Sequence, residues 1–92
     1  MNIGKLEIEN NMAEVNIKAQ SSKVKVDDAK ANLNIVIANT SDLVIDEDEL
    51  TEYSYTFINK PALQQGAFTS SSNPKAVNVT IDSDTSSTVR LD

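Results

Sequence analysis

The chain has 92 residues, of which 39% are hydrophobic and 24% charged, and its net charge at pH 7 is −6. A chain of this length forms one domain, so we expect a single all-β domain over residues 1–92. Cysteine and histidine are both absent. Their absence excludes disulfides, zinc–thiolate sites, cysteine nucleophiles and the usual general base. The acidic balance, 14 acids against 8 bases, repels phosphate backbones and predicts no nucleic-acid partner.

No membrane partner is expected either. The sequence contains no run of 18 consecutive apolar residues, which a membrane-spanning helix requires. Residues 1–10 hold no apolar stretch of the kind that a secretory signal contains. We therefore expect a chain that stays in a cytoplasm, or one that is packaged from the host cytoplasm into a virion.

Apolar and polar residues alternate along almost the whole chain. Alternation over four to eight residues is typical of a half-buried β-strand. The pattern predicts eight short strands, which lie at residues 5–9, 14–18, 23–27, 32–37, 42–46, 52–60, 75–82 and 89–91.

The first four predicted strands repeat at an interval of nine residues. Two series of apolar residues show this period, one being Leu6, Val15, Val24 and Leu33, the other Ile8, Ile17, Val26 and Ile35. Nine residues suit a five-residue strand and a four-residue turn, and a β-solenoid also gives a regular period. Solenoid corners commonly use glycine, and this chain has only two. We therefore expect an antiparallel up-and-down β-sandwich or small barrel, with a β-solenoid-like fold as the alternative.

Residues 59–74 interrupt the alternation. Pro61 can open a helical turn and Gly66 can end it, and a serine-rich loop follows. We expect a crossover loop at 59–74 that carries one helical turn. The strand pattern also predicts which side chains point into the core, and these are Val15, Ile17, Val24, Val26, Leu33, Ile35, Tyr55, Val79 and Ile81. Tyr53 and Phe57 share a strand face with Tyr55 and are expected to pack with it.

Nothing in the sequence supplies catalytic chemistry. Ser70, Ser71 and Ser72 have no histidine to activate them, and Lys60 and Lys75 lie beside turn signals. The acidic runs, Asp46–Glu49 and Asp82 with Asp84, lack the spacing of an EF-hand loop. We interpret them as solvated turns, with a cation site as the alternative. The expectation is a non-enzyme with no catalytic residues, no cofactor and no metal.

The charges separate when the eight strands are traced up and down. Eleven of the acids then fall at one end of the domain and six of the bases at the other. Like charges facing each other across a hairpin destabilise it. The pattern is therefore either an accident that the fold tolerates or a sign that each end contacts something of opposite charge. The candidate interface residues are Lys5, Lys18, Lys23 and Lys60 at the basic end, and Glu9, Glu14, Asp46, Glu47, Asp48, Asp82 and Asp84 at the acidic end.

Two functions fit these features. The first is a non-enzymatic structural protein of a repeated assembly, in particular a small phage virion component such as a capsid decoration, connector or tail protein. Its partners would be other copies of itself and other structural proteins, and acidic-on-basic contacts would stack them head to tail. The alternative is a monomeric, cytoplasmic acidic binding module, such as an inhibitor or immunity protein for a basic partner.

Overall fold

The computed structural model describes residues 4–66 and 70–92, which form nine strands. Each of the eight predicted strands is present, and the ninth, β7, lies in the segment where we expected a helical turn. The strands are β1 (Lys5–Glu9), β2 (Val15–Gln20), β3 (Lys23–Asp27), β4 (Leu33–Ala38), β5 (Asp42–Asp46), β6 (Tyr53–Phe57), β7 (Leu63–Gln65), β8 (Val77–Ser83) and β9 (Thr88–Leu91).

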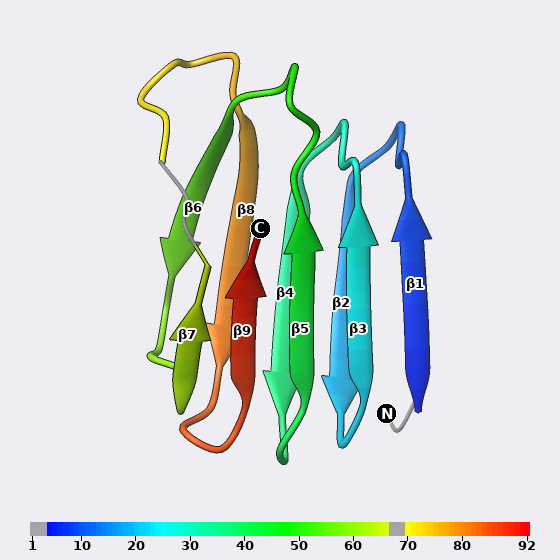
Figure 1. The fold of residues 1–92 in the computed structure, drawn as a ribbon, viewed down its shortest axis with the longest axis vertical. Helices are drawn as coiled ribbons and strands as arrows, with labels where there is room; N and C mark the ends of the chain where they lie inside the picture. Colours follow the sequence, from blue (N-terminus) through cyan, green and yellow to red (C-terminus); the bar gives the residue numbers. More distant parts are fainter. Residues whose placement is uncertain (1–3, 67–69) are drawn as a thin grey trace.

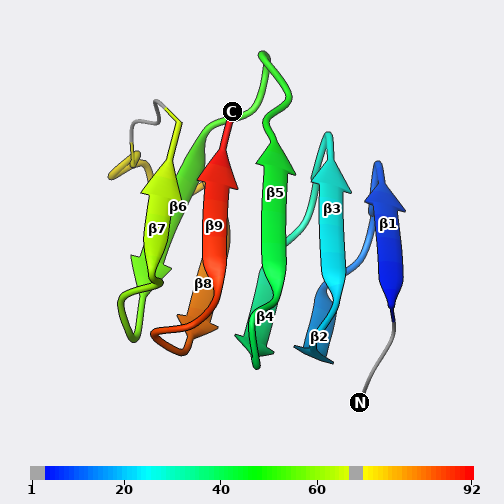
Figure 2. The ribbon, with the colours of Figure 1, turned by 60° about the horizontal axis from the view of Figure 1, so that its bottom comes forward.

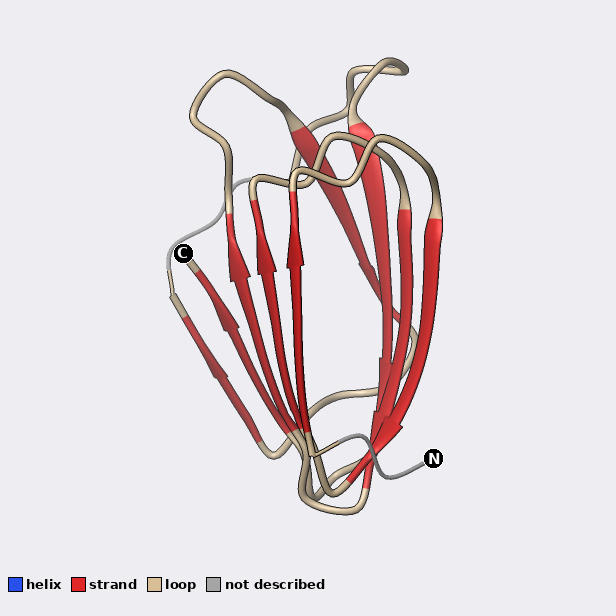
Figure 3. Cartoon of the chain, turned by 90° about the vertical axis from the view of Figure 1, so that its right-hand side faces the viewer, coloured by secondary structure: helices blue, strands red, loops and turns tan. Residues whose placement is uncertain are grey.

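The strands make two sheets that pack face to face (Figure 3). Sheet A has the order β1-β3-β5-β9-β7, and sheet B has the order β2-β4-β8-β6. Every pairing within a sheet is parallel. The expectation of a two-sheet all-β domain is therefore confirmed, and the expectation of antiparallel pairing is wrong.

Consecutive strands lie in opposite sheets, so the chain winds as a flattened coil (Figure 1). Leu6 pairs with Val24, and Val15 pairs with Leu33, so one full turn of the coil takes eighteen residues. The nine-residue period thus marks half a coil and not one hairpin of a meander. This arrangement is the solenoid-like alternative.

The corners of the coil explain why a chain with so little glycine can wind in this way. Positive φ angles occur at Asn10, Ser21, Asp28, Asn39 and Thr40, with values from 49° to 61°. Asn and Asp tolerate this left-handed region because their short polar side chains bond locally. These residues take the role for which we expected glycine, so counting glycines was the wrong test.

The coil reverses near its end. The first turns are right-handed in Figures 1 and 3, but the chain then places β6 and β7 at the far end and returns to insert β8 and β9. Because the winding sense is unchanged while the axial direction reverses, the return crossover has the opposite hand, which is rare for parallel strands. The return crossover connects Gly66 to Ala76. Residues 67–69, which belong to the crossover loop that we expected at 59–74, lie outside the described residues.

A glycine is required where this crossover begins. Gly66 has a φ of +100°, and a Cβ atom built there would lie 1.6 Å from the carbonyl oxygen of Leu91. The expected helical turn over residues 61–66 is wrong. Leu63–Gln65 pairs instead with β9 and forms the outermost strand of sheet A.

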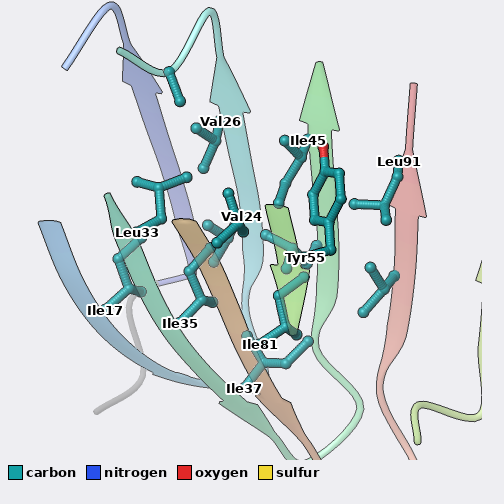
Figure 4. Close-up of a cluster of buried hydrophobic side chains, with 14 of the residues drawn as sticks. Ile17, Val24, Val26, Leu33, Ile35, Ile37, Ile45, Tyr55, Ile81 and Leu91 are labelled. Carbon is teal, nitrogen blue, oxygen red and sulfur yellow. The ribbon is translucent and has the colours of Figure 1, made fainter. Parts of the chain in front are cut away.

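The core lies between the two sheets, and the predicted set is confirmed (Figure 4). Eight of the nine predicted residues are buried, and Val15 is partly buried against the same cluster. Tyr53 and Tyr55 stack with ring centroids 6.2 Å apart. Ile8, Leu6 and Val15 at one end of the coil, and Phe57 at the other, are only partly covered.

A column of serines joins the corners at the lower end of the strands. Ser22, Ser41 and Ser87 occupy equivalent corners before β3, β5 and β9, and all three are buried. The backbone N–H groups of Gly4, Ser22 and Ser41 each donate to the hydroxyl of the next serine, at 3.2 Å in every case. The column ends at the next corner, where Ala62 has no hydroxyl group.

Candidate functional site

The acidic end of the domain is the end at which β1, β3 and β5 finish, at the top of Figure 1. Most of the predicted acidic interface residues lie here, together with the C-terminal Asp92, whose N–H bonds to Ile45. Lys30 and Lys75 are the bases at this end. The acids gathered here are Glu9, Glu14, Asp27, Asp28, Asp46, Glu47, Asp48, Glu49, Glu52 and Asp92.

The opposite, lower end holds Lys5, Lys18, Lys23 and Lys60, as expected. The placement of Asp82 and Asp84 at the acidic end is wrong. Because β8 runs parallel to β4, it descends, and Asp84 reaches the lower corner where its carboxylate accepts the N–H of Asn39 at 2.9 Å. The separation of charge therefore holds for β1 to β6 and fails for β8 and β9. Arg90 lies in mid-strand beside Val44.

The acidic loop, residues 47–52 between β5 and β6, is anchored by two buried tyrosines. The Tyr53 hydroxyl donates to the carbonyl of Ala29 at 2.7 Å and accepts the N–H of Asp48 at 3.1 Å. The Tyr55 hydroxyl donates to the Glu47 carboxylate at 2.5 Å. Burial raises the pKa of both tyrosines above 10, so both stay protonated as donors at neutral pH.

Asp48 organises the tip of the acidic loop. Its carboxylate accepts the N–H of Leu50 at 3.2 Å and the hydroxyl of Thr51 at 2.9 Å, and it pairs with Lys30. The hydrogen bond from Lys30 lowers the pKa of Asp48, and the same bond raises the pKa of Lys30. The turn holds the side chain of Leu50 outward, 95% exposed. The loop thus presents one large apolar side chain among carboxylates.

A groove of about 410 Å³ lies on the outer face of sheet A, the face that Figure 2 shows. Its volume falls within the range of roughly 300–1,000 Å³ that small ligand sites occupy. Two rows of the sheet line it, and both run across β3, β5 and β9. The outward side chains of these rows are Lys5, Lys23, Asp42, Thr88 and Leu63 in one row, and Lys25, Val44, Arg90 and Gln65 in the other.

The groove is basic, although the net charge of the protein is −6. Of its lining residues, Asp42 is the acid, and it accepts a hydrogen bond from the Thr88 hydroxyl. Arg90 bonds Asp92 at 3.1 Å, and Glu7 lies beside Lys25 in the register of β1 with β3. Lys23 and Lys25 make no ion pair with any residue in the described ranges. Val44 adds apolar surface between Lys25 and Arg90, and Leu63 adds apolar surface at the β7 end of the other row.

A search of residues 4–66 and 70–92 finds no group of three or more acidic, histidine or cysteine side chains placed to hold a metal ion. The same ranges contain no helix that is long and apolar enough to cross a membrane. Comparison of the chain with protein-family models, with curated proteins and with solved structures finds no match.

Sequence reasoning missed both the groove and the exposed Leu50. The groove depends on which strands are neighbours, because Lys25, Val44 and Arg90 are far apart in sequence. A repeated sequence motif could have shown that β3, β5 and β9 are neighbours. The motif is Ser or Thr, then Ser, then any residue, and then two aliphatic residues with one residue between them. It occurs at residues 21–26 (SSKVKV), 40–45 (TSDLVI) and 86–91 (SSTVRL).

Proposed function

We propose that this protein is a non-enzymatic structural protein that assembles with further copies of itself and with other structural proteins. The particular form we propose is a small component of a phage particle, in keeping with a small β domain whose turns and loops are rich in Asn, Ser and Thr. The observation that carries the proposal is an open end of the coil, at which both sheets present a strand edge.

The open end consists of β1 and β2, the first strands of sheets A and B. Gly4 C=O and Asn10 N–H bond to β3, so alternation along the strand turns the backbone groups of Lys5, Glu7 and Glu9 outward. Within the described residues, no segment pairs with that outer side of either strand. Unpaired edges are templates for pairing with another chain.

The far end of the coil differs. Sheet B ends there at β6, whose backbone is covered by the segment that follows β7: Ser71 N–H bonds the Tyr53 carbonyl at 2.8 Å, and Tyr55 N–H bonds the Ser70 hydroxyl at 3.0 Å. Sheet A ends at the three-residue β7. The open end also exposes parts of Leu6 and Ile8, so pairing there would cover apolar surface as well.

Sedimentation velocity of Glu7→Pro and Glu7→Ala tests this proposal. Proline removes the outward N–H of an edge strand without breaking the bonds of β1 to β3, whereas alanine removes the charge and keeps the N–H. We expect wild type and Glu7→Ala to form oligomers of the same size and Glu7→Pro to form smaller ones, with its circular dichroism unchanged. A wild-type protein that is monomeric at all concentrations contradicts the proposal, as does a Glu7→Pro variant that assembles normally.

A second candidate, a monomeric acidic binding module for a basic partner, draws on the ten acids at the upper end of the strands. A concentrated charge of one sign speeds association with a partner of opposite sign and makes the rate depend on salt. A monomeric wild type that binds a basic protein in a salt-dependent manner supports this candidate over the first.

A further inference from the structure

The groove on the outer face of sheet A and the acidic loop at the top of the strands have complementary features. The groove has lysines around an apolar floor. The loop has a fully exposed leucine between carboxylates. We propose that the acidic loop of one copy binds the sheet A groove of a second copy, with Leu50 against Val44, which lies between Lys25 and Arg90. This inference rests on the proposed function, whose partner surface it names.

The loop is built to be presented. Asp48 fixes its turn through Leu50 and Thr51, and the Tyr53 hydroxyl fixes Asp48 to the body of the protein. An anchor that is already ordered before binding loses less conformational freedom on binding. Exposing a leucine at 95% without a partner has no benefit for folding, because the apolar surface stays in water.

The charges of the two surfaces match. Glu49 is exposed next to Leu50, and Lys23 and Lys25, which form no ion pair within residues 4–66 and 70–92, border the groove. Parallel strands lie about 4.8 Å apart, so Lys25 and Val44 are neighbours across the sheet, a spacing that the adjacent side chains of Glu49 and Leu50 can match. The apolar contact supplies affinity, and the charges supply orientation and speed of encounter.

The proposed contact joins two different surfaces, so it is heterologous. The acidic end lies at the top of the strands and the groove on their outer face, so one copy can use both surfaces at once and extend a chain of copies. The partner of the acidic end is then the outer face of sheet A rather than the lower end of the strands.

Sedimentation in the Glu7→Pro background measures this contact with edge pairing at β1 weakened. We expect Leu50→Ser to weaken the remaining self-association roughly tenfold or more, as loss of a buried leucine predicts. Lys25→Glu should also weaken it, because the reversed charge repels Glu49 of the loop. The matched controls are Met12→Ser, an 85% exposed apolar residue at the same end, and Lys60→Glu, an exposed lysine between β6 and β7 that lies outside the groove and the open end. Both controls should leave the association unchanged.

Mixing the two disabled proteins gives a second readout. Leu50→Ser retains a working groove and Lys25→Glu retains a working loop, so the mixture should form dimers and stop there. The proposal is overturned if the Glu7→Pro protein is monomeric, if the test variants behave like their controls, or if mixing restores nothing. If Glu7→Pro abolishes all oligomers, the result supports the proposed function through strand-edge pairing and contradicts the groove contact. If only Leu50→Ser abolishes them, the result supports the groove contact and contradicts strand-edge pairing. If the groove binds an unrelated acidic protein and not a second copy, Leu50→Ser and Met12→Ser will show the same self-association, which contradicts the proposal.

Discussion

The backbone N–H of Ser22 donates to the hydroxyl of Ser41 at 3.2 Å, although the two residues are 19 positions apart. The Ser41 hydroxyl in turn donates to the carbonyl of Ala38 at 2.7 Å. The Ser41 hydroxyl therefore makes one hydrogen bond within its own corner and a second one to the corner that lies one turn of the coil earlier. Both serines are almost wholly buried, so water cannot replace these bonds.

Ser41→Ala is expected to destabilise the fold by about 1–3 kcal/mol, because it leaves the buried N–H of Ser22 without that acceptor. Urea titrations measure the change in the free energy of unfolding. The matched control is Ser21→Ala, whose hydroxyl makes an exposed bond to the carbonyl of Asn39 and should matter by less than about 0.5 kcal/mol. Equal losses in the two variants would show that the buried column contributes nothing special.

Ile35→Ala is expected to cost about 2–5 kcal/mol, because the side chain is 1% exposed in the middle of the core. Its neighbour Val36 lies on the outer face of the same strand and is 36% exposed, so Val36→Ala should cost far less. Thermal or urea unfolding of the pair checks the assignment of faces on β4. A melting point that Ile35→Ala leaves unchanged contradicts the assignment.

Thr40→Gly is expected to stabilise the protein by about 0.5–1 kcal/mol. Thr40 is β-branched and has a φ of +61°, a conformation that costs most side chains roughly 1–2 kcal/mol and glycine almost nothing. The control is Thr56→Gly on the exposed face of β6, where the same substitution should destabilise. If both variants are destabilised, the corner at Thr40 is not strained.

Asp84→Asn is expected to flatten the acid dependence of stability. The Asp84 carboxylate accepts the N–H of Asn39 and hydrogen bonds from Ser86 and Ser87, which hold its pKa at about 2 against an ordinary value of 3.8. A lowered folded pKa gives stability that is complete above the unfolded value and is lost as the pH falls through the folded one. Wild type should therefore lose stability more steeply than the variant between about pH 4 and pH 2. Parallel curves in urea titrations at these pH values would contradict the assignment.

The alternation of apolar and polar residues predicted the strands and the core correctly, because side-chain direction depends on neighbours along one strand. Ile17 and Ile35 are buried as expected. Which strands pair was not predictable in the same way. A nine-residue period is compatible with a hairpin and with half a coil, since both bury the same faces.

The candidate interface shows the same division. Lys5, Lys23, Glu9 and Asp46 lie at the expected ends, because consecutive strands run in opposite directions in a meander and in a coil alike. Asp84 does not, because β7 adds a strand between β6 and β8 and so reverses the direction of β8. Three residues, Leu63–Gln65, are too few to show an alternating pattern.

Amide hydrogen exchange of β1 and β2, followed as a function of protein concentration, tests most directly whether the open end of the coil is where copies meet. The outward N–H groups of Glu7 on β1 and Lys18 on β2 face solvent in an isolated chain, whereas Val26 N–H lies inside sheet A at every concentration. Our account predicts that exchange at Glu7 and Lys18 slows as concentration rises, while exchange at Val26 stays constant. Rapid exchange at Glu7 and Lys18 at all concentrations, including those at which oligomers are present, would contradict it.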